Sequence, residues 1–199
     1  ITAEIPGLLF DDTKPLDFTD RIQKTNKGML VLSGSMSPVT RRQNVVALES
    51  GCFEGSQIDP LAIVKGEFKL TDFTRQVAAK LNDNKNVLVY SPYESKQMVL
   101  EYIKEAGISE VLAGLRISQA MAQITFDVVQ KYTPGKLLIA GGETSGEICS
   151  KLGINELEAG LPVDTGVPYC FSKVNPNLLL ILKSGNFGSE NLYIKVLNL

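Results

Sequence analysis

The sequence predicts an α/β fold in which helices flank a mostly parallel sheet, as a single compact domain after an N-terminal arm. Short, nearly continuous apolar runs, typical of strands that are covered on both faces, alternate with stretches of helical period. The chain has 199 residues, 44% of them hydrophobic and 21% charged, which suffices for one well-packed core. We expect residues 1–27 to form the arm or an inter-domain connection and residues 28–199 to form the domain.

The first 27 residues lack a regular pattern because proline, glycine and aspartate interrupt every apolar period. The pair Asp11-Asp12 is interpreted as a solvated turn, and residues 18–24 as one short amphipathic stretch. The chain begins with Ile1 rather than methionine, so we expect a processed chain or a piece of a longer protein.

From Met29 onward the sequence alternates between apolar runs and helical stretches with recognisable start and stop signals. The predicted strands span residues 29–32, 58–64, 87–90, 137–140 and 178–182. The predicted helices span residues 38–50, 71–81, 94–106, 116–132, 145–152 and 189–197, the last of them capped by Ser189. Residues 157–167 are expected to form an irregular rim of the sheet because glycine and proline interrupt them.

The composition excludes several classes of chemistry. The chain has no histidine, which rules out Ser-His-Asp triads, Cys-His dyads and histidine-ligated zinc. Three cysteines without a C-x-x-C spacing argue against a disulfide scaffold and favour a reduced, cytoplasmic setting. A net charge of −2 without a long basic run gives no indication of nucleic-acid or membrane-surface binding. The longest apolar run, five residues at 178–182, is far too short to cross a membrane.

The first of three glycine-bearing loops spans residues 33–38, between a predicted strand and a predicted helix that Ser37 caps before Pro38. Such a junction presents backbone N–H groups and the positive end of a helix dipole, which suits a phosphate. Arg41 and Arg42, in or just after the first helical turn, oppose that dipole unless an anion lies nearby. The alternative is a well-capped helix with two solvated arginines. The candidate residues are Ser33, Gly34, Ser35 and Ser37.

The second loop spans residues 141–146 and has the same strand–loop–helix context. Its paired glycines allow a ligand to approach the backbone closely. Thr144 and Glu147 match a capping box, which would satisfy part of the same N–H set internally. Glu143 could hold a Mg²⁺-bound water or a ribose hydroxyl, or face solvent. The candidate residues are Gly141, Gly142, Glu143, Thr144 and Ser145.

The third loop spans residues 183–188 and also follows an apolar strand. We expect Lys183 near the mouth of the crevice, while Phe187 either flanks a base or fills the loop. The alternative is an ordinary turn between a strand and a helix. The candidate residues are Lys183, Gly185 and Asn186. All three loops should open on the edge of a parallel sheet where α/β folds bind ligands.

The sequence contains neither the G-x-x-x-x-G-K-[ST] motif nor the G-x-G-x-x-G motif, so a dinucleotide-binding domain of an oxidoreductase is poorly supported. The loops favour a mononucleotide phosphate site of another type.

In order and context, the three loops resemble those of the four-carbon acid sugar kinases. The resemblance rests on residues 32–37 with Thr40 and Gln43, residues 140–145, residues 166–168 and residues 182–188. It covers most of the chain and concerns the C-terminal, nucleotide-binding half of those enzymes. No counterpart of their N-terminal Ala-Asp-Asp motif is found, and Glu143 stands where many members have aspartate.

The resemblance implies an ATP- or ADP-binding domain, assisted by Mg²⁺, of a cytoplasmic kinase that phosphorylates threonate- or erythronate-like acids. The acid site would lie in an N-terminal half outside this sequence, so this chain alone should bind nucleotide weakly and transfer no phosphoryl group. The catalytic base and the oligomeric state stay open. The alternative is a non-catalytic nucleotide-sensing or interaction domain of the same fold.

Overall fold

The computed structural model describes residues 17–22, 26–92 and 94–199, so the expectations for residues 1–16 lie outside it. In the described chain one mixed sheet has the strand order β2-β3-β1-β4-β7-β6-β5. The strands are β1 (Met29–Ser33), β2 (Glu54–Gln57), β3 (Val87–Tyr90), β4 (Lys136–Ala140), β5 (Leu157–Asp164), β6 (Val167–Ser172) and β7 (Leu179–Lys183). Strands β2, β3, β1, β4 and β7 are parallel, and β6 and β5 extend the sheet antiparallel.

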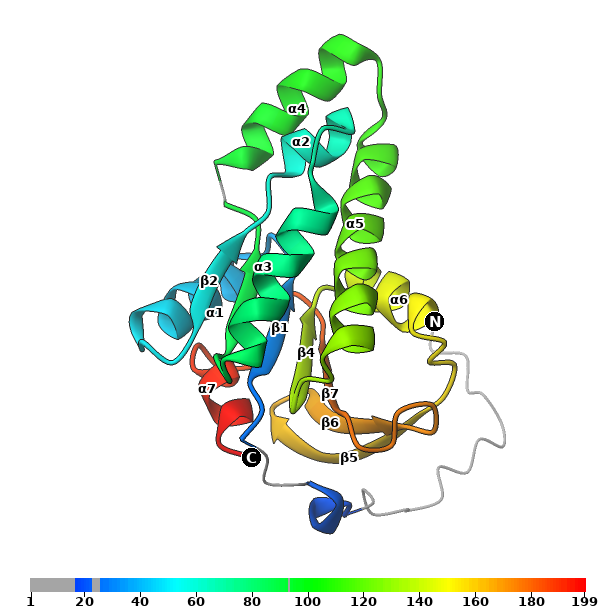
Figure 1. The fold of residues 1–199 in the computed structure, drawn as a ribbon. Coiled ribbons are helices and arrows are strands. Elements are labelled where there is room, and N and C mark those ends of the chain that lie inside the picture. Colours follow the sequence, from blue (N-terminus) through cyan, green and yellow to red (C-terminus); the bar gives the residue numbers. More distant parts are fainter. Residues whose placement is uncertain (1–16, 23–25, 93) are drawn as a thin grey trace, which may run out of the picture.

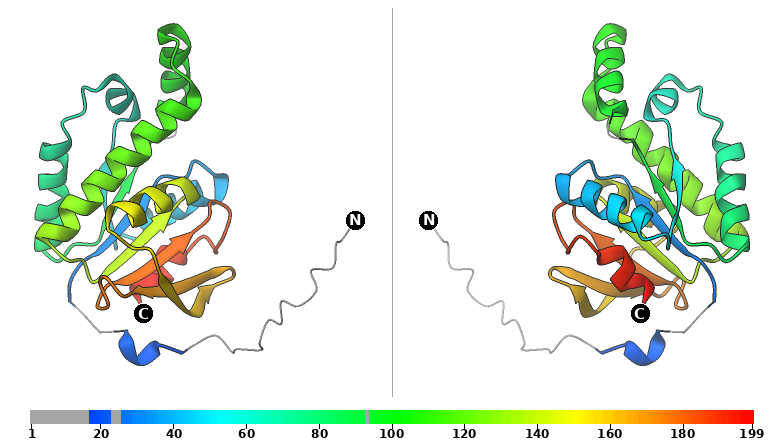
Figure 2. Two further views of the ribbon diagram at one scale, coloured as in Figure 1. Left: turned by 90° about the vertical axis from the view of Figure 1, so that its right-hand side faces the viewer. Right: turned by 90° about the vertical axis from the view of Figure 1, so that its left-hand side faces the viewer.

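The helices lie on both faces of this sheet (Figures 1 and 2). They are α1 (Pro38–Glu49), α2 (Pro60–Lys65), α3 (Leu70–Asn82), α4 (Ser95–Ala106), α5 (Glu110–Lys131), α6 (Gly142–Lys151) and α7 (Leu192–Leu197), with a 3-10 turn η1 (Thr19–Arg21). The predicted fold class, a mostly parallel sheet flanked by helices, is confirmed. The boundary between residues 27 and 28 stays a prediction.

Two apolar clusters explain why helices cover both faces. Alternate residues of one strand belong to different clusters: Leu30 and Leu32 pack with α3, α5 and α6, whereas Met29 and Val31 pack with α1 and α7. This alternation follows from the two-residue period of a strand. Both sets of side chains are buried, which is why the sequence of β1 reads as a continuous apolar run.

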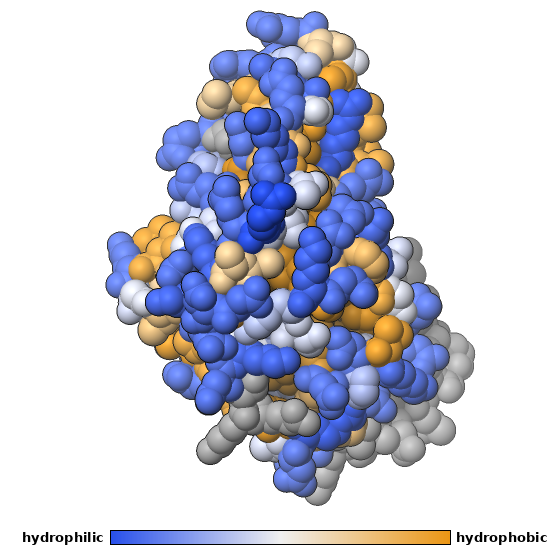
Figure 3. Space-filling view, in the orientation of Figure 1, coloured by the Kyte–Doolittle hydropathy of each residue, from blue (hydrophilic) through white to orange (hydrophobic). Residues whose placement is uncertain are grey.

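A third apolar cluster lies beyond the carboxyl edge of the sheet and joins α2, α4 and the first turns of α5. Figure 1 shows this part projecting away from the strands. The face seen in Figure 3 is mainly hydrophilic, with apolar side chains in separate patches. Within the described part of the chain, none of the helices has the length and apolar content that crossing a bilayer requires.

The predicted strand at residues 58–64 is wrong. Asp59 caps α2 by accepting a hydrogen bond from the Ala62 N–H, Pro60 occupies the first helical position, and Gly66 ends the helix at φ +78°. The strand that precedes this helix is β2, whose residues are mostly exposed and include no large apolar side chain, so they gave no apolar signal. Start and stop residues therefore outweigh an apolar run of this length.

The irregular rim expected at residues 157–167 is also wrong, because β5 and β6 form an antiparallel pair there. The pairing register shifts around Pro162, which stands opposite Pro168. Proline is tolerated at such irregularities because it cannot donate a ladder hydrogen bond. The same two prolines concealed the strands in the sequence.

Helix boundaries differ at three places. Helix α5 begins at Glu110, six residues before its predicted start, because the Ser109 side chain accepts from the Leu112 N–H. Helix α6 begins at Gly142 rather than residue 145, and α7 begins at Leu192 after Asn191, so Ser189 is not its cap. Helices α1, α3 and α4 and strands β1, β3, β4 and β7 lie within one residue of their predicted ranges.

Candidate functional site

The carboxyl ends of the five parallel strands form one row across the sheet. In the pairing register Gln57 lies beside Tyr90, Tyr90 beside Ser33, Ser33 beside Ala140, and Ala140 beside Lys183. The three glycine-bearing loops follow three adjacent strands of this row, namely β1, β4 and β7. The prediction that they open on one edge of a parallel sheet is confirmed.

Most backbone donors of the first loop already have an acceptor within the protein. The N–H groups of Gly34 and Ser35 both donate to the Ala140 carbonyl at 2.9 Å, and the Ser37 N–H donates to Ser35 Oγ at 3.2 Å. Ser37 caps α1 as predicted, because its Oγ accepts from the Thr40 N–H at 3.1 Å. The loop therefore offers an anion fewer free N–H groups than the sequence suggested.

Gly34 brings the first loop against the second. A Cβ atom on this residue would lie 2.0 Å from Thr144 Oγ1, a distance that no side chain can occupy. Arg42, one of the two cations near this loop, pairs with Glu190 at 3.1 Å, so its counter-charge is a carboxylate of the protein itself.

The second loop presents an uncapped helix terminus. Gly141 is the N-cap of α6 at φ +131°, a conformation that side chains rarely adopt, and its N–H donates to the Lys183 carbonyl. The predicted capping box is wrong, because Thr144 lies inside the first turn of the helix. Among the described residues, the N–H groups of Gly142, Glu143 and Thr144 have no acceptor.

Open space surrounds this terminus. A Cβ atom on Gly142 would meet no heavy atom within 4 Å. Three unpaired N–H groups and the positive end of the α6 dipole therefore face a region that a ligand can enter. This geometry is well suited to a phosphate or a carboxylate.

Lys183 lies beneath the third loop, so the expected position at the mouth of the crevice is wrong. Its side chain is 2% exposed, and Nζ donates to Thr40 Oγ1 at 2.8 Å and to the Gly185 carbonyl at 3.1 Å. Burial lowers the pKa of Lys183 to about 8. None of the ion pairs within the described chain includes this ammonium, which is held by hydrogen bonds alone.

The remaining residues of the third loop face the first loop on one side and solvent on the other. The Gly185 carbonyl accepts from the hydroxyls of Ser37 and Thr40, and a Cβ on Gly185 would lie 2.7 Å from Ser35 Oγ. Asn186 is exposed. The half-exposed ring of Phe187 packs against Gly166, where a Cβ would lie 2.3 Å from the ring.

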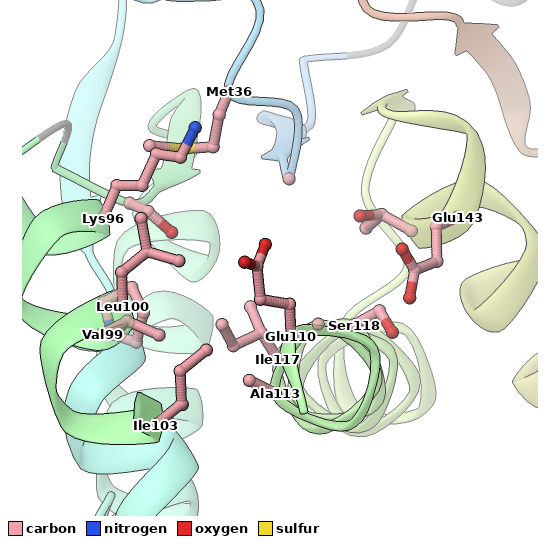
Figure 4. A pocket seen from close by; sticks show the side chains of 15 residues that line it. Met36, Lys96, Val99, Leu100, Ile103, Glu110, Ala113, Ile117, Ser118 and Glu143 are labelled. Carbon is pink, nitrogen blue, oxygen red and sulfur yellow. The ribbon is translucent and has the colours of Figure 1, made fainter. Parts of the chain in front are cut away.

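A cavity of about 240 Å³ adjoins the second loop between α4 and α5. Figure 4 shows apolar side chains of α4 and α5, including Val99 and Ile103, facing the hollow, with the carboxylates of Glu110 and Glu143 at its rim. Glu143 lies over Gly114 of α5, since a Cβ there would be 3.7 Å from Oε1. The cavity thus joins an apolar wall to the open terminus of α6.

Sequence reasoning missed the part of the site that α4 and α5 contribute. Apolar residues at helical spacing, such as Ile117, are typical of a core face, and the pattern alone does not distinguish such a face from a cavity wall. The cavity residues outside the predicted loops are Pro60, Ser91, Lys96, Val99, Leu100, Ile103, Glu110, Ala113, Gly114, Ile117 and Ser118, and Met36 of the first loop also lines the cavity without having been a candidate.

No group of three or more acidic or cysteine side chains that could hold a metal ion occurs among the described residues. A nucleotide-bound Mg²⁺ does not need one, because it keeps several waters and takes one or two carboxylates together with the phosphates. Glu143 and Glu110 are carboxylates at the cavity rim that could serve in this way.

Comparison with known proteins adds independent information. The family model described as "Nucleotide-binding C-terminal domain" matches residues 30–193. A 3-oxo-tetronate kinase of Cupriavidus necator is 33% identical over 168 residues, which are 84% of this chain and 37% of that protein. A D-threonate kinase of Salmonella typhimurium is 28% identical over 170 residues, which are 82% of this chain and 40% of that protein.

Among solved structures, a protein of Haemophilus influenzae superposes with a TM-score of 0.76 at 24% identity, covering 94% of this chain and 42% of that chain. This likeness supports the fold. The chain spans about two fifths of the length of the relatives it matches.

Proposed function

The chain belongs to the family of nucleotide-binding C-terminal domains, and from this membership we propose that it is the ATP-binding domain of a kinase for four-carbon sugar acids. The names of the two relatives support the substrate class, since both are kinases of tetronate-type acids. The acid site belongs, in this proposal, to the part of those longer proteins that the chain does not cover.

The observation that carries the proposal is the open N-terminus of α6 between the first and third loops. The N–H groups of Gly142, Glu143 and Thr144 bind the phosphates, and Ser145 lies in the same helical turn. The buried ammonium of Lys183 stabilises their negative charge from beneath the third loop. Phosphoryl transfer depends mainly on such positioning and charge stabilisation.

The other predicted residues take supporting roles. Gly34 and Gly141 permit the close approach of the first and second loops. Ser35 and Ser37 hold the first loop against Gly185, while Asn186 presents its exposed side chain beside the phosphates. Ser33 ends β1 in the row of strand ends.

The cavity between α4 and α5 receives the base of the nucleotide. Its apolar wall contacts the faces of an aromatic ring, and the Glu143 carboxylate at its rim reaches a ribose hydroxyl or a Mg²⁺-bound water. When bound, Mg²⁺ neutralises charge on the phosphates. The group that accepts the proton of the substrate hydroxyl comes from outside this chain. A cytoplasmic location, where ATP is supplied, is part of the proposal, and the oligomeric state is left open.

Calorimetric titration of the folded chain with ADP and Mg²⁺ tests the proposal. We expect weak but saturable binding, and the absence of heat at millimolar ADP in a folded sample would contradict it.

A matched pair of substitutions sharpens this experiment. Gly142 and Gly146 are both positions of α6 where an added Cβ meets nothing within 4 Å, so each has space for the first atom of a side chain. Gly142→Val places a side chain at the open N–H groups and should weaken ADP binding at least tenfold. Gly146→Val lies four residues, about 6 Å, further along the helix and should leave the affinity within about twofold. Equal affinities of the two variants would exclude the α6 terminus as the phosphate site.

A further inference from the structure

Helix α1 buries a polar stripe instead of an apolar one. Its buried residues Thr40, Gln43, Asn44 and Ala47 follow the spacing of one helix face, yet three of the four are polar. Polar side chains in such positions need hydrogen-bond partners, and those of Thr40 and Gln43 lie in and just after the third loop.

Gln43 binds this segment by a single atom. Its side chain is fully buried, and Nε2 donates to the carbonyls of Phe187, Gly188 and Ser189 at 3.0–3.1 Å. The other amide atom, Oε1, is buried without a partner in the described chain. At this position the glutamine side chain therefore acts through its Nε2 donor, whereas its Oε1 acceptor makes no hydrogen bond.

The inward carbonyls determine where the N–H groups of this segment point. The described chain contains no cis peptide bond, and in a trans peptide the N–H points opposite to the carbonyl of the preceding residue. The carbonyls of Gly185, Phe187 and Gly188 are bound by α1 side chains, so the N–H groups that share their peptide planes point away from α1. They belong to Asn186, Gly188 and Ser189.

Two of these N–H groups lack an acceptor within the described chain. The Ser189 N–H donates to Asp164, whereas those of Asn186 and Gly188 have no acceptor among the described residues. Gly188 adopts φ +81°, a conformation typical of backbone nests that turn N–H groups toward an anion. Asn186 as a residue is exposed to solvent.

We propose that Gln43 is a positioning residue that, by holding the carbonyls of residues 187–189 inward, turns the third loop into an anion-binding nest for the nucleotide's phosphates. This proposal rests on the proposed function for the identity of the anion. It adds a second set of backbone donors, from Asn186 and Gly188, to those of the α6 terminus. It assigns the orientation of the Gly188 N–H to Gln43, which binds the Phe187 carbonyl, while Thr40 binds the Gly185 carbonyl and so orients the Asn186 N–H.

Amide resonances of the ¹⁵N-labelled full chain test the proposal, with inorganic pyrophosphate as the probe because it has the phosphates of a nucleotide without the base. Saturating pyrophosphate should shift the amide resonances of Asn186 and Gly188. If these two resonances stay in place in the wild-type protein, the proposal is overturned, whether or not ADP binds. If the protein binds ADP but pyrophosphate does not shift these two amide resonances, the proposed function is retained and only the anion-binding nest is refuted.

Gln43→Leu removes the donor and should weaken pyrophosphate binding at least tenfold, while adenosine binding changes less than twofold. Asn44→Leu is the matched control, because Asn44 lies on the same buried stripe but accepts from the Tyr193 hydroxyl instead of contacting the third loop. Pyrophosphate affinity that is unchanged in folded Gln43→Leu would refute the positioning role. If Gln43→Leu does not fold, Gln43→Met replaces it under the same criterion.

Discussion

Lys183 shows how the physical setting of one residue can alter the role expected from its sequence. Following an apolar strand and preceding Ser184-Gly185, it has the context of an exposed phosphate ligand. The structure instead buries its ammonium against Thr40 and the Gly185 carbonyl. A buried cation costs free energy unless it is paired or hydrogen-bonded, and here hydrogen bonds replace a carboxylate partner.

The pH dependence of stability should reveal this burial. Because burial lowers the pKa of Lys183 to about 8 from an ordinary 10.5, the unfolded chain binds more protons than the folded one between these values. The contribution of Lys183 to the free energy of unfolding should therefore rise with pH across this window, by up to about 3 kcal/mol. Urea unfolding at pH 7, 8, 9 and 10 measures it.

Lys183→Met should flatten this rise and increase stability at pH 7 by about 1 kcal/mol, since an apolar side chain avoids the burial of charge. The exposed Lys104→Met in α4 serves as the control and should retain the wild-type slope. A Lys183→Met variant with an unchanged pH slope would show that the ammonium is solvated.

At the scale of elements, α7 and the third loop depend on a residue at the end of a distant strand. Asp164, the last residue of β5, accepts hydrogen bonds from the N–H and hydroxyl of Ser189 and from Lys195 Nζ. The hydrogen bond from the Ser189 hydroxyl has the largest effect on the pKa of Asp164 and that from Lys195 the second largest. Together they hold this pKa well below its usual range. This contact fixes the point where the third loop ends.

Asp164→Asn should lower the free energy of unfolding at pH 7 by about 1–3 kcal/mol, because the amide replaces a charged acceptor. A carboxylate with a lowered pKa stabilises the folded state above its unfolded pKa, and this stabilisation is lost as pH falls below about 4. The difference between variant and wild type should therefore shrink between pH 7 and pH 3. Urea unfolding at pH 7 and at pH 3 measures this difference. The control variant Glu190→Gln alters only an exposed ion pair with Arg42 and should have the free energy of unfolding of the wild type at both pH values.

The elements also show where sequence reasoning succeeds. Strands β1, β3, β4 and β7 lie in the middle of the sheet and are buried on both faces, so their apolar runs stand out. The outer strands β2, β5 and β6 were missed. Strand β2 is mostly exposed and has no large apolar side chain, and β5 and β6 contain Pro162 and Pro168. Local start signals such as Asp59-Pro60 and Ser109 were present in the sequence and were outweighed by apolar patterns.

At the scale of the whole molecule, the proposed division of the two sites can be tested. It matches about two fifths of its relatives, and the proposed acid site lies in the remainder. We expect the isolated chain to bind ADP but to produce no phosphorylated acid from ATP and D-threonate. Coupled measurement of ADP release with and without the acid checks this, and acid-dependent turnover by the isolated chain would show that both sites lie within these residues.

The sequence by itself determined the fold class and the three loops, because buried parallel strands and glycine-bearing junctions leave strong local patterns. It could not determine which loop keeps free N–H groups. That depends on hydrogen bonds between residues far apart, such as those of Gly34 and Ser35 to Ala140. Tertiary structure likewise decided three further features: the cavity between α4 and α5, the burial of Lys183, and the hydrogen bonds from Gln43 to the third loop. Each of them arises where separate elements meet.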